Sequence, residues 1–123
     1  MLNQSPKKLL FLNQNTPYGT RQAKESLDAA LAAAVFGQHV SLLFMDDGVW
    51  QLLKQQTPEP QTKPNLANQW PAVEMYDIEH IYVEAQAMQQ RGLDAEDLVV
   101  DTHWLNAEQI SDLLEQQDVI LSF

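Results

Sequence analysis

Residues 7–53 read KKLLFLNQNTPYGTRQAKESLDAALAAAVFGQHVSLLFMDDGVWQLL. Two continuous apolar runs, at 9–12 and 40–45, flank a polar turn at 13–20 and an alanine-rich segment with apolar residues at helical spacing. Apolar runs of this kind are typical of strands covered on both faces. Strand, crossover helix and second strand predict a parallel sheet, and ligands of such sheets gather beyond the carboxyl ends of the strands.

The rest of the chain continues the alternation of strands and helices. We expect strands at 81–83, 98–100 and 119–123, and helices at 66–76, 85–90 and from Trp104 onward. Asn106 and Gln109 resemble a capping box, and residues 55–65, with their prolines, favour a loop. The pattern predicts a single α/β domain over 1–123, a three-layer sandwich around a five-stranded, mainly parallel sheet of order 2-1-3-4-5.

Charge is distributed unevenly along the chain. Seventeen acidic and seven basic residues give a net charge of −10. Residues 1–40 carry four basic and two acidic residues, whereas 41–123 carry three basic and fifteen acidic ones. Because Lys and Arg contacts to phosphate dominate nucleic-acid affinity, we expect no direct binding to nucleic acid. No apolar run has the length of a membrane span or of a signal peptide, so we expect a cytoplasmic, membrane-free protein.

Several residues carry candidate chemistry. Asp46, Asp47 and Asp101 each follow an expected strand and could hold Mg²⁺, but Glu84 ends the third strand and no lysine lies beyond Lys63. We therefore favour Asp46 and Asp47 as turn or helix caps and expect no metal.

Two further patterns are incomplete. The turn at 13–20 loosely resembles a flavin phosphate loop but has one glycine, and His103 near Asp101 lacks a nucleophile. A structural turn and a surface histidine are the favoured readings, with no cofactor. Tryptophans 50, 70 and 104 lie near expected helix starts and suit either the core or a partner interface.

Six segments together resemble the TusC/DsrF family, in family order over nearly the whole chain. They are 17–20 (PYGT), 25–32 (ESLDAALA), 47–53 (DGVWQLL), 75–79 (MYDIE), 91–94 (RGLD) and 118–123 (DVILSF).

The resemblance implies a DsrE/F/H-like fold and a place in a complex with TusB-like and TusD-like chains, a heterohexamer built as two trimers. That complex passes persulfide sulfur, through a TusE-like carrier, toward 2-thiolation of the wobble uridine of tRNA. In the family the sulfur is held by a cysteine of the TusD-like subunit, at the end of the third strand. Glu84 stands at this position, and the chain has no cysteine. A carboxylate cannot form a persulfide.

We therefore expect a non-catalytic subunit that supports a neighbour's cysteine, with no catalytic residue of its own. Candidate interface or strand-end residues are Asp46, Asp47, Trp50, Glu84 and Trp104. Without its partners the chain is expected to self-associate through exposed apolar helix faces. The alternative is an independent flavin- or Mg²⁺-binding protein of the flavodoxin or receiver type.

Overall fold

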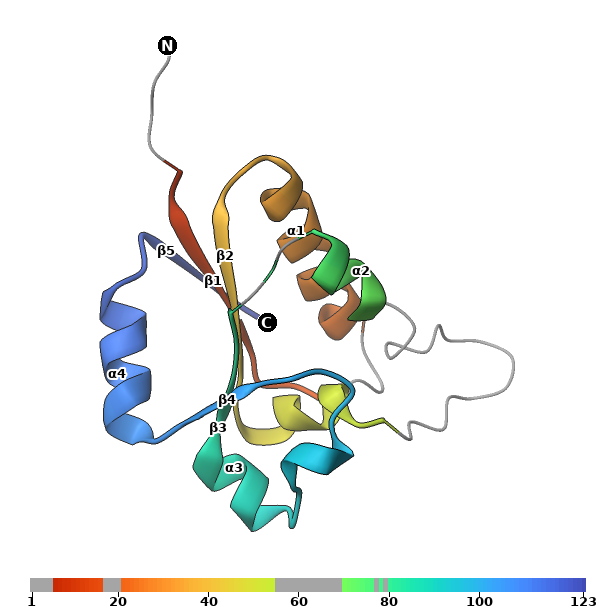
Figure 1. Cartoon of the computed structure of the whole chain (residues 1–123). Coiled ribbons are helices and arrows are strands. Elements are labelled where there is room, and N and C mark those ends of the chain that lie inside the picture. The colour runs from red at the N-terminus through yellow and green to blue at the C-terminus, as the bar shows by residue number, and fades with distance from the viewer. Residues whose placement is uncertain (1–5, 17–20, 55–69, 77, 79) are drawn as a thin grey trace.

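A five-stranded sheet organises the chain in a computed structural model that describes residues 6–16, 21–54, 70–76, 78 and 80–123 (Figure 1). The strands are β1 (Lys8–Asn13), β2 (His39–Phe44), β3 (His80–Glu84), β4 (His103–Leu105) and β5 (Val119–Ser122). Each pair of neighbouring strands is parallel. The predicted α/β class with a parallel sheet is confirmed.

The strand order differs from the prediction. The order across the sheet is β4-β3-β2-β1-β5, so the predicted order 2-1-3-4-5 is wrong. The predicted order would make β2 an edge strand, but β2 is central and Val40 to Phe44 are all buried. An apolar run reports burial on both faces but not which strands lie beside it, so the order does not follow from it.

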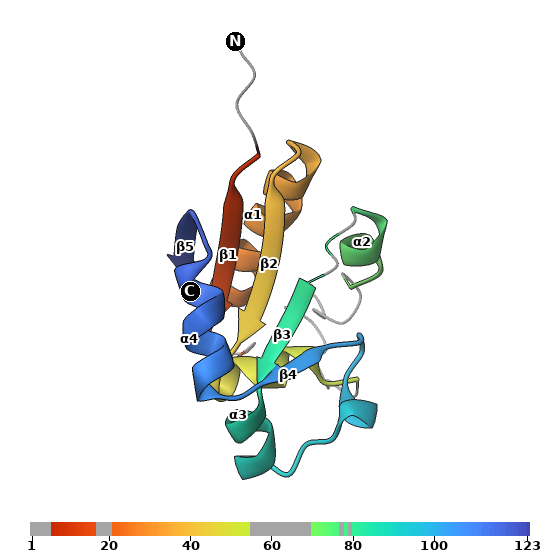
Figure 2. The same ribbon diagram turned by 60° about the vertical axis from the view of Figure 1, so that its left-hand side comes forward.

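The direction of the chain across the sheet explains the three layers. From β1 to β4 the chain moves in one direction, and right-handed crossovers then place α1 (Gln22–Val35) and α2 (Trp70–Met75) on the same face. The return to β5 reverses that direction and places α4 (Ala107–Glu115) on the opposite face (Figures 1 and 2). Shorter elements complete the fold: the 3₁₀ helices η1 (Asp46–Leu52) and η3 (Ala95–Asp97), and α3 (Ala85–Gln90).

The two faces of the sheet carry cores of unequal size. The face under α1 and α2 holds the larger cluster, which includes Phe11, Leu42, Phe44 and Trp70. The face under α4 has four buried members: Leu10, Leu43, Ile110 and Leu113. Because strand side chains alternate between faces, Leu42 and Leu43 serve different cores.

The fourth strand was predicted in the wrong place. Residues 98–100 form no regular strand: Leu98 makes an isolated antiparallel bridge with Leu53, and the Val99 N–H donates to the Leu52 carbonyl at 2.8 Å. Leu98 and Val100 are nevertheless buried in the core. The apolar run therefore reflected packing against η1, and β4 forms later, at His103–Leu105.

The two longer helices largely follow their patterns. In α1, Ala23, Leu27 and Ala30 are buried as predicted, but Val35 is 59% exposed and does not belong to the buried face. Gly37, with φ +84°, adopts the left-handed conformation that commonly ends a helix. The capping box of α4 is confirmed, with both Asn106–Gln109 hydrogen bonds at 2.8 Å.

The expected loop at 55–65 and the first part of the helix expected at 66–76 lie outside the described residues. Pro71 lies in the first turn of α2, where it removes no helical hydrogen bond. Among the residues that the structure describes, no helix is long and apolar enough to cross a membrane.

Candidate functional site: the carboxyl ends of the strands

Strands β1, β2 and β3 end at the same edge of the sheet, and the chain turns sharply there into η1. The Met45 N–H donates to the carbonyl of Asn13 at 3.0 Å, which ties the end of β2 to the end of β1. Gly48 then passes so close to β1 that an added Cβ would lie 2.0 Å from the Asn13 oxygen. Only glycine fits this approach, which accounts for the Asp46-Asp47-Gly48 sequence.

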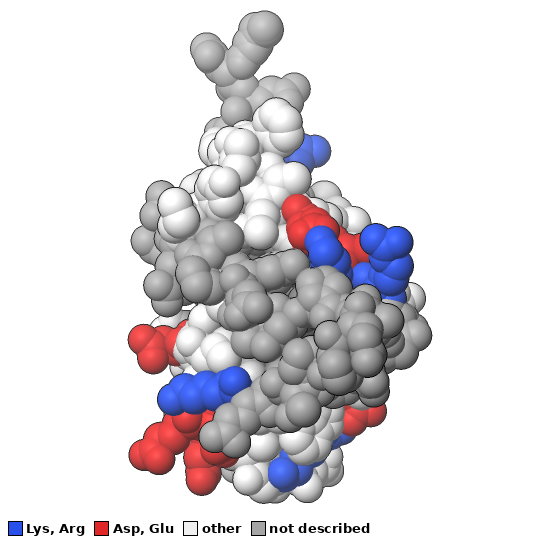
Figure 3. Space-filling model, turned by 90° about the vertical axis from the view of Figure 1, so that its right-hand side faces the viewer, with Lys and Arg blue, Asp and Glu red and all other residues white. Residues whose placement is uncertain are grey.

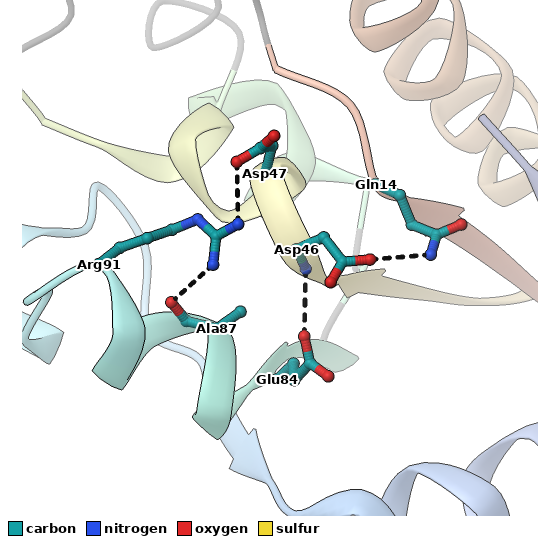
Figure 4. A network of polar contacts seen from close by, with 6 residues as sticks. All are labelled: Gln14, Asp46, Asp47, Glu84, Ala87 and Arg91. Atoms are coloured by element: carbon teal, nitrogen blue, oxygen red, sulfur yellow. Dashed lines mark hydrogen bonds and ion pairs between the residues drawn. The ribbon is translucent and has the colours of Figure 1, made fainter.

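Asp46 has an unusual backbone conformation. Its φ is +50°, the single positive value among the described non-glycine residues. Aspartate tolerates this region better than most residues. Two side chains hold the turn: the Asp46 N–H donates to Glu84 Oε1 at 3.1 Å, and Gln14 Nε2 donates to Asp46 Oδ2 at 3.2 Å (Figure 4).

Arg91 connects η1 to α3. Its guanidinium donates to Asp47 Oδ1 at 2.9 Å and to the Ala87 carbonyl at 3.2 Å (Figure 4). The Arg91 side chain is 19% exposed and that of Asp47 55% exposed, so the pair is partly screened by water. We refer to Gln14, Asp46, Asp47, Glu84 and Arg91 as the carboxyl-end network.

Glu84 stands at the position where, as the family resemblance implies, the TusD-like subunit carries its cysteine. It ends β3 and directly precedes α3, but its side chain does not cap that helix. One of its carboxylate oxygens instead accepts the backbone N–H of Asp46. The observed contact of Glu84 is therefore with the backbone of the strained turn.

The structure gathers some of the predicted acids and separates another. Asp46, Asp47 and Glu84 lie in one network, as Figure 4 shows. Asp101 does not join them, because it precedes β4 instead of following a strand. No group of three potential metal ligands occurs among the described residues. The convergence of Asp46, Asp47 and Asp101, on which the Mg²⁺ alternative rested, is therefore contradicted.

The remaining candidates are dispersed. Trp70 is buried against Phe44, whereas Trp50 and Trp104 are half-buried, and Trp104 lies in β4 instead of opening a helix. His103 is exposed and packs beside Tyr82, with ring centroids 5.7 Å apart. Half of the turn proposed for flavin, residues 17–20, lies outside the described residues.

Sequence reasoning did not single out Gln14 or Arg91 as site residues. Gln14 follows β1 directly, and Arg91 was named only within the 91–94 segment of the family resemblance. The available signal was positional: both lie next to expected strand or helix ends that face the Asp46 turn. Within the described part of the chain, the network contains no thiol and no paired nucleophile and base.

The fold is a parallel α/β domain. In its site, the hydrogen-bonded carboxylate of Glu84 stands at the carboxyl end of β3. Comparison with known proteins then places the chain: residues 7–123 match the model of the DsrE/DsrF-like family, and the chain belongs to that family.

Named relatives agree with this assignment. The chain is 36% identical to a "Protein TusC homolog" of Vibrio parahaemolyticus over 94% of this chain and 98% of the relative. It is 32% identical to the "Intracellular sulfur oxidation protein DsrF" of Allochromatium vinosum, over 95% of this chain and 96% of the relative. Among solved structures it resembles the YchN protein of E. coli, with a TM-score of 0.82 and 18% identity over 95% and 99% of the two chains, a likeness of fold.

Proposed function

We propose that this protein is a non-catalytic subunit of a cytoplasmic sulfur-relay complex that supports 2-thiolation of the wobble uridine in tRNA. Its partners would be TusB-like and TusD-like chains, assembled as a heterohexamer, with a TusE-like carrier receiving the sulfur. The observation that carries the proposal is Glu84. It stands at the end of β3, where the TusC/DsrF resemblance expects the sulfur-bearing cysteine of the TusD-like subunit. The chain contains no cysteine at all.

The chemistry of sulfur relay supports a scaffold role. Persulfide transfer needs a thiolate, since a thiolate sulfur is both the nucleophile and the carrier. The Glu84 carboxylate offers neither, and it accepts a hydrogen bond from Asp46. The residue at the position of the TusD-like cysteine therefore holds the strand-end turn in this chain.

Exposed apolar side chains supply candidate contacts for the partner chains. Phe36 at the end of α1 is 82% exposed, and Met75 at the end of α2 is 79% exposed. On the face that carries α1 and α2, Figure 3 shows uncharged side chains in the upper part and a group of acidic residues at the lower left. Exposed large apolar groups that gather on one surface are typical of protein–protein contacts.

A second candidate contact is the strand at one edge of the sheet. In β5, Val119, Ile120 and Leu121 are between 37% and 42% exposed. The strand pairs with β1 on one side and ends the sheet on the other. An edge strand exposes unpaired backbone groups, and apolar side chains on it favour coverage by another chain.

Native mass spectrometry after co-expression with TusB-like and TusD-like chains tests the assembly. We expect a complex that contains all three chains in equal numbers. Phe36→Ser and Ile120→Ser should each weaken it, whereas Gln89→Ser, at an exposed position of α3, should not. Recovery of this chain as a lone monomer in the presence of both partners would contradict the proposal.

Glu84→Ala in the assembled complex tests the non-catalytic role. We expect tRNA thiolation to stay within about twofold of the unmodified complex, because no sulfur transfer passes through this residue. Omitting the whole chain should abolish the relay. A sulfur adduct detected on the purified chain, or full relay activity in its absence, would overturn the proposed function.

A further inference from the structure

A groove of about 320 Å³ opens at the opposite end of the sheet from the carboxyl-end network. It lies on the α4 face, between the amino ends of the central strands and the C-terminal end of α4. In Figure 2, α4 lies in front of the β1 side of the sheet, and β3 lies on the far side of β2 from β1. We refer to it as the amino-end groove.

The strand register places the polar side chains of the groove side by side. Lys8 of β1 pairs with His39 of β2, and Ser41 of β2 pairs with His80 of β3. Side chains two residues apart on a strand share a face, and neighbouring strands lie about 4.8 Å apart. One ammonium, two imidazoles and a hydroxyl therefore border the same space across three strands.

Tyr82 extends this surface along β3. Its ring stacks on that of His80, with centroids 6.2 Å apart and ring planes 9° from parallel. The two rings therefore lie side by side on the groove wall. Among the described residues, Lys8 Nζ and the His39 and His80 rings make no hydrogen bond or ion pair within the protein. Their donors are therefore directed to solvent or to a ligand.

The lining is also free of carboxylates, in a chain of net charge −10. The remaining lining residues come from the end of α4: Leu113, Gln116 and Gln117. Gln117 Nε2 donates to the Leu113 carbonyl at 3.1 Å, and Gln117 Oε1 is buried without a hydrogen-bond partner among the described residues. Asp118 is the acid beside Lys8, and its carboxylate accepts the Lys8 backbone N–H at 2.7 Å.

From this donor set we propose that the amino-end groove binds a small oxyanion, either a phosphate or a carboxylate group. Lys and His side chains form charge-assisted hydrogen bonds with such groups, and the Ser41 and Tyr82 hydroxyls can add neutral ones. The groove would be a ligand site separate from Glu84, at the other end of the same strand. The proposal does not depend on the sulfur-relay role.

Nuclear magnetic resonance titration of the full chain tests the proposal. Sodium phosphate and sodium citrate would be added separately, each against sodium chloride at matched ionic strength. We expect saturable shifts of the His39, His80 and Tyr82 ring signals with at least one of the two anions. The anion that binds more tightly identifies the phosphate or the carboxylate as the favoured group.

Two charge-matched variants make the test specific. Lys8→Gln should weaken binding about tenfold, the effect expected for loss of one charge-assisted hydrogen bond. Lys24→Gln removes an equal charge from the exposed Lys24–Asp28 pair of α1 and should change the affinity less than twofold. Non-saturating shifts, shifts matched by chloride, or equal losses in both variants would overturn the proposal.

Discussion

The polar side chains at the two ends of the sheet differ in whether they form hydrogen bonds or ion pairs within the protein. At the carboxyl ends, Asp46, Glu84 and Arg91 bind one another or the backbone, so the charges of the network are used to hold a turn. At the amino ends, the side chains of Lys8, His39 and His80 border the groove and make no hydrogen bond or ion pair among the described residues. Internally paired groups contribute to the fold, and unpaired donors remain available for a ligand. The family resemblance places the chemistry at the carboxyl ends of the strands. In this chain the polar residues at that end mainly stabilise the fold.

The largest expected effect tests how tightly the carboxyl-end turn is packed. Gly48→Ala would place a Cβ 2.0 Å from the Asn13 carbonyl oxygen, and both groups belong to backbone that cannot move freely. We expect a loss of at least about 3 kcal/mol in the free energy of unfolding, measured by urea denaturation.

Gly37→Ala is the matched control for this prediction. Gly37 has φ +84° but nothing within 4 Å of an added Cβ, so only the backbone conformation opposes the substitution. The loss should be about 1–2 kcal/mol. Equal losses in the two variants would mean that the approach of Gly48 to Asn13 adds no constraint.

A smaller effect is expected at the link between η1 and α3. Arg91→Ala removes hydrogen bonds to Asp47 and to the Ala87 carbonyl, and the side chain is mostly buried. We expect a loss of about 1–2 kcal/mol, also by urea denaturation, because Asp47 stays hydrated. Lys24→Ala, which breaks an exposed i,i+4 pair, should cost about 0.3–0.5 kcal/mol. If the loss is no greater than that of Lys24→Ala, Arg91 does not stabilise the turn more than an exposed ion pair stabilises a helix.

The smallest effect is expected in the amino-end groove. His80→Ala removes an exposed ring with no hydrogen-bond partner among the described residues, so stability should change by less than about 0.5 kcal/mol. The same variant should weaken oxyanion binding, measured by the titration described above. A large loss of stability would show that the stack on Tyr82 supports the fold, and the contrast between the two ends would fail.

Much of the fold could be predicted because its signals are local. The apolar runs of β1 and β2, the spacing of α1 and the capping pair of α4 each depend on neighbouring residues. The strand order and the place of β4 could not be predicted, since the apolar residues Leu98 and Val100 are buried while Leu98 and Val99 bond to the end of η1 instead of forming a regular strand. Val35 likewise fits the helical spacing of apolar residues but is exposed at the end of α1.

The candidate site was predictable in part. Parallel strands bring their carboxyl ends together, so Asp46, Asp47 and Glu84 could be expected at one edge. The partners that hold them, Gln14 and Arg91, depend on how η1 and α3 pack. The amino-end groove depends on which part of the sheet α4 leaves uncovered, and that follows from the strand order.

The exposed apolar residues of β5 carry a consequence for how the protein must be made. A strand edge that no subunit covers can recruit further strands, which is a route to aggregation. Surplus copies of the chain would therefore lose solubility and become substrates for proteolysis. In the proposed assembly, the expected consequence is synthesis of this chain in balance with its partner chains.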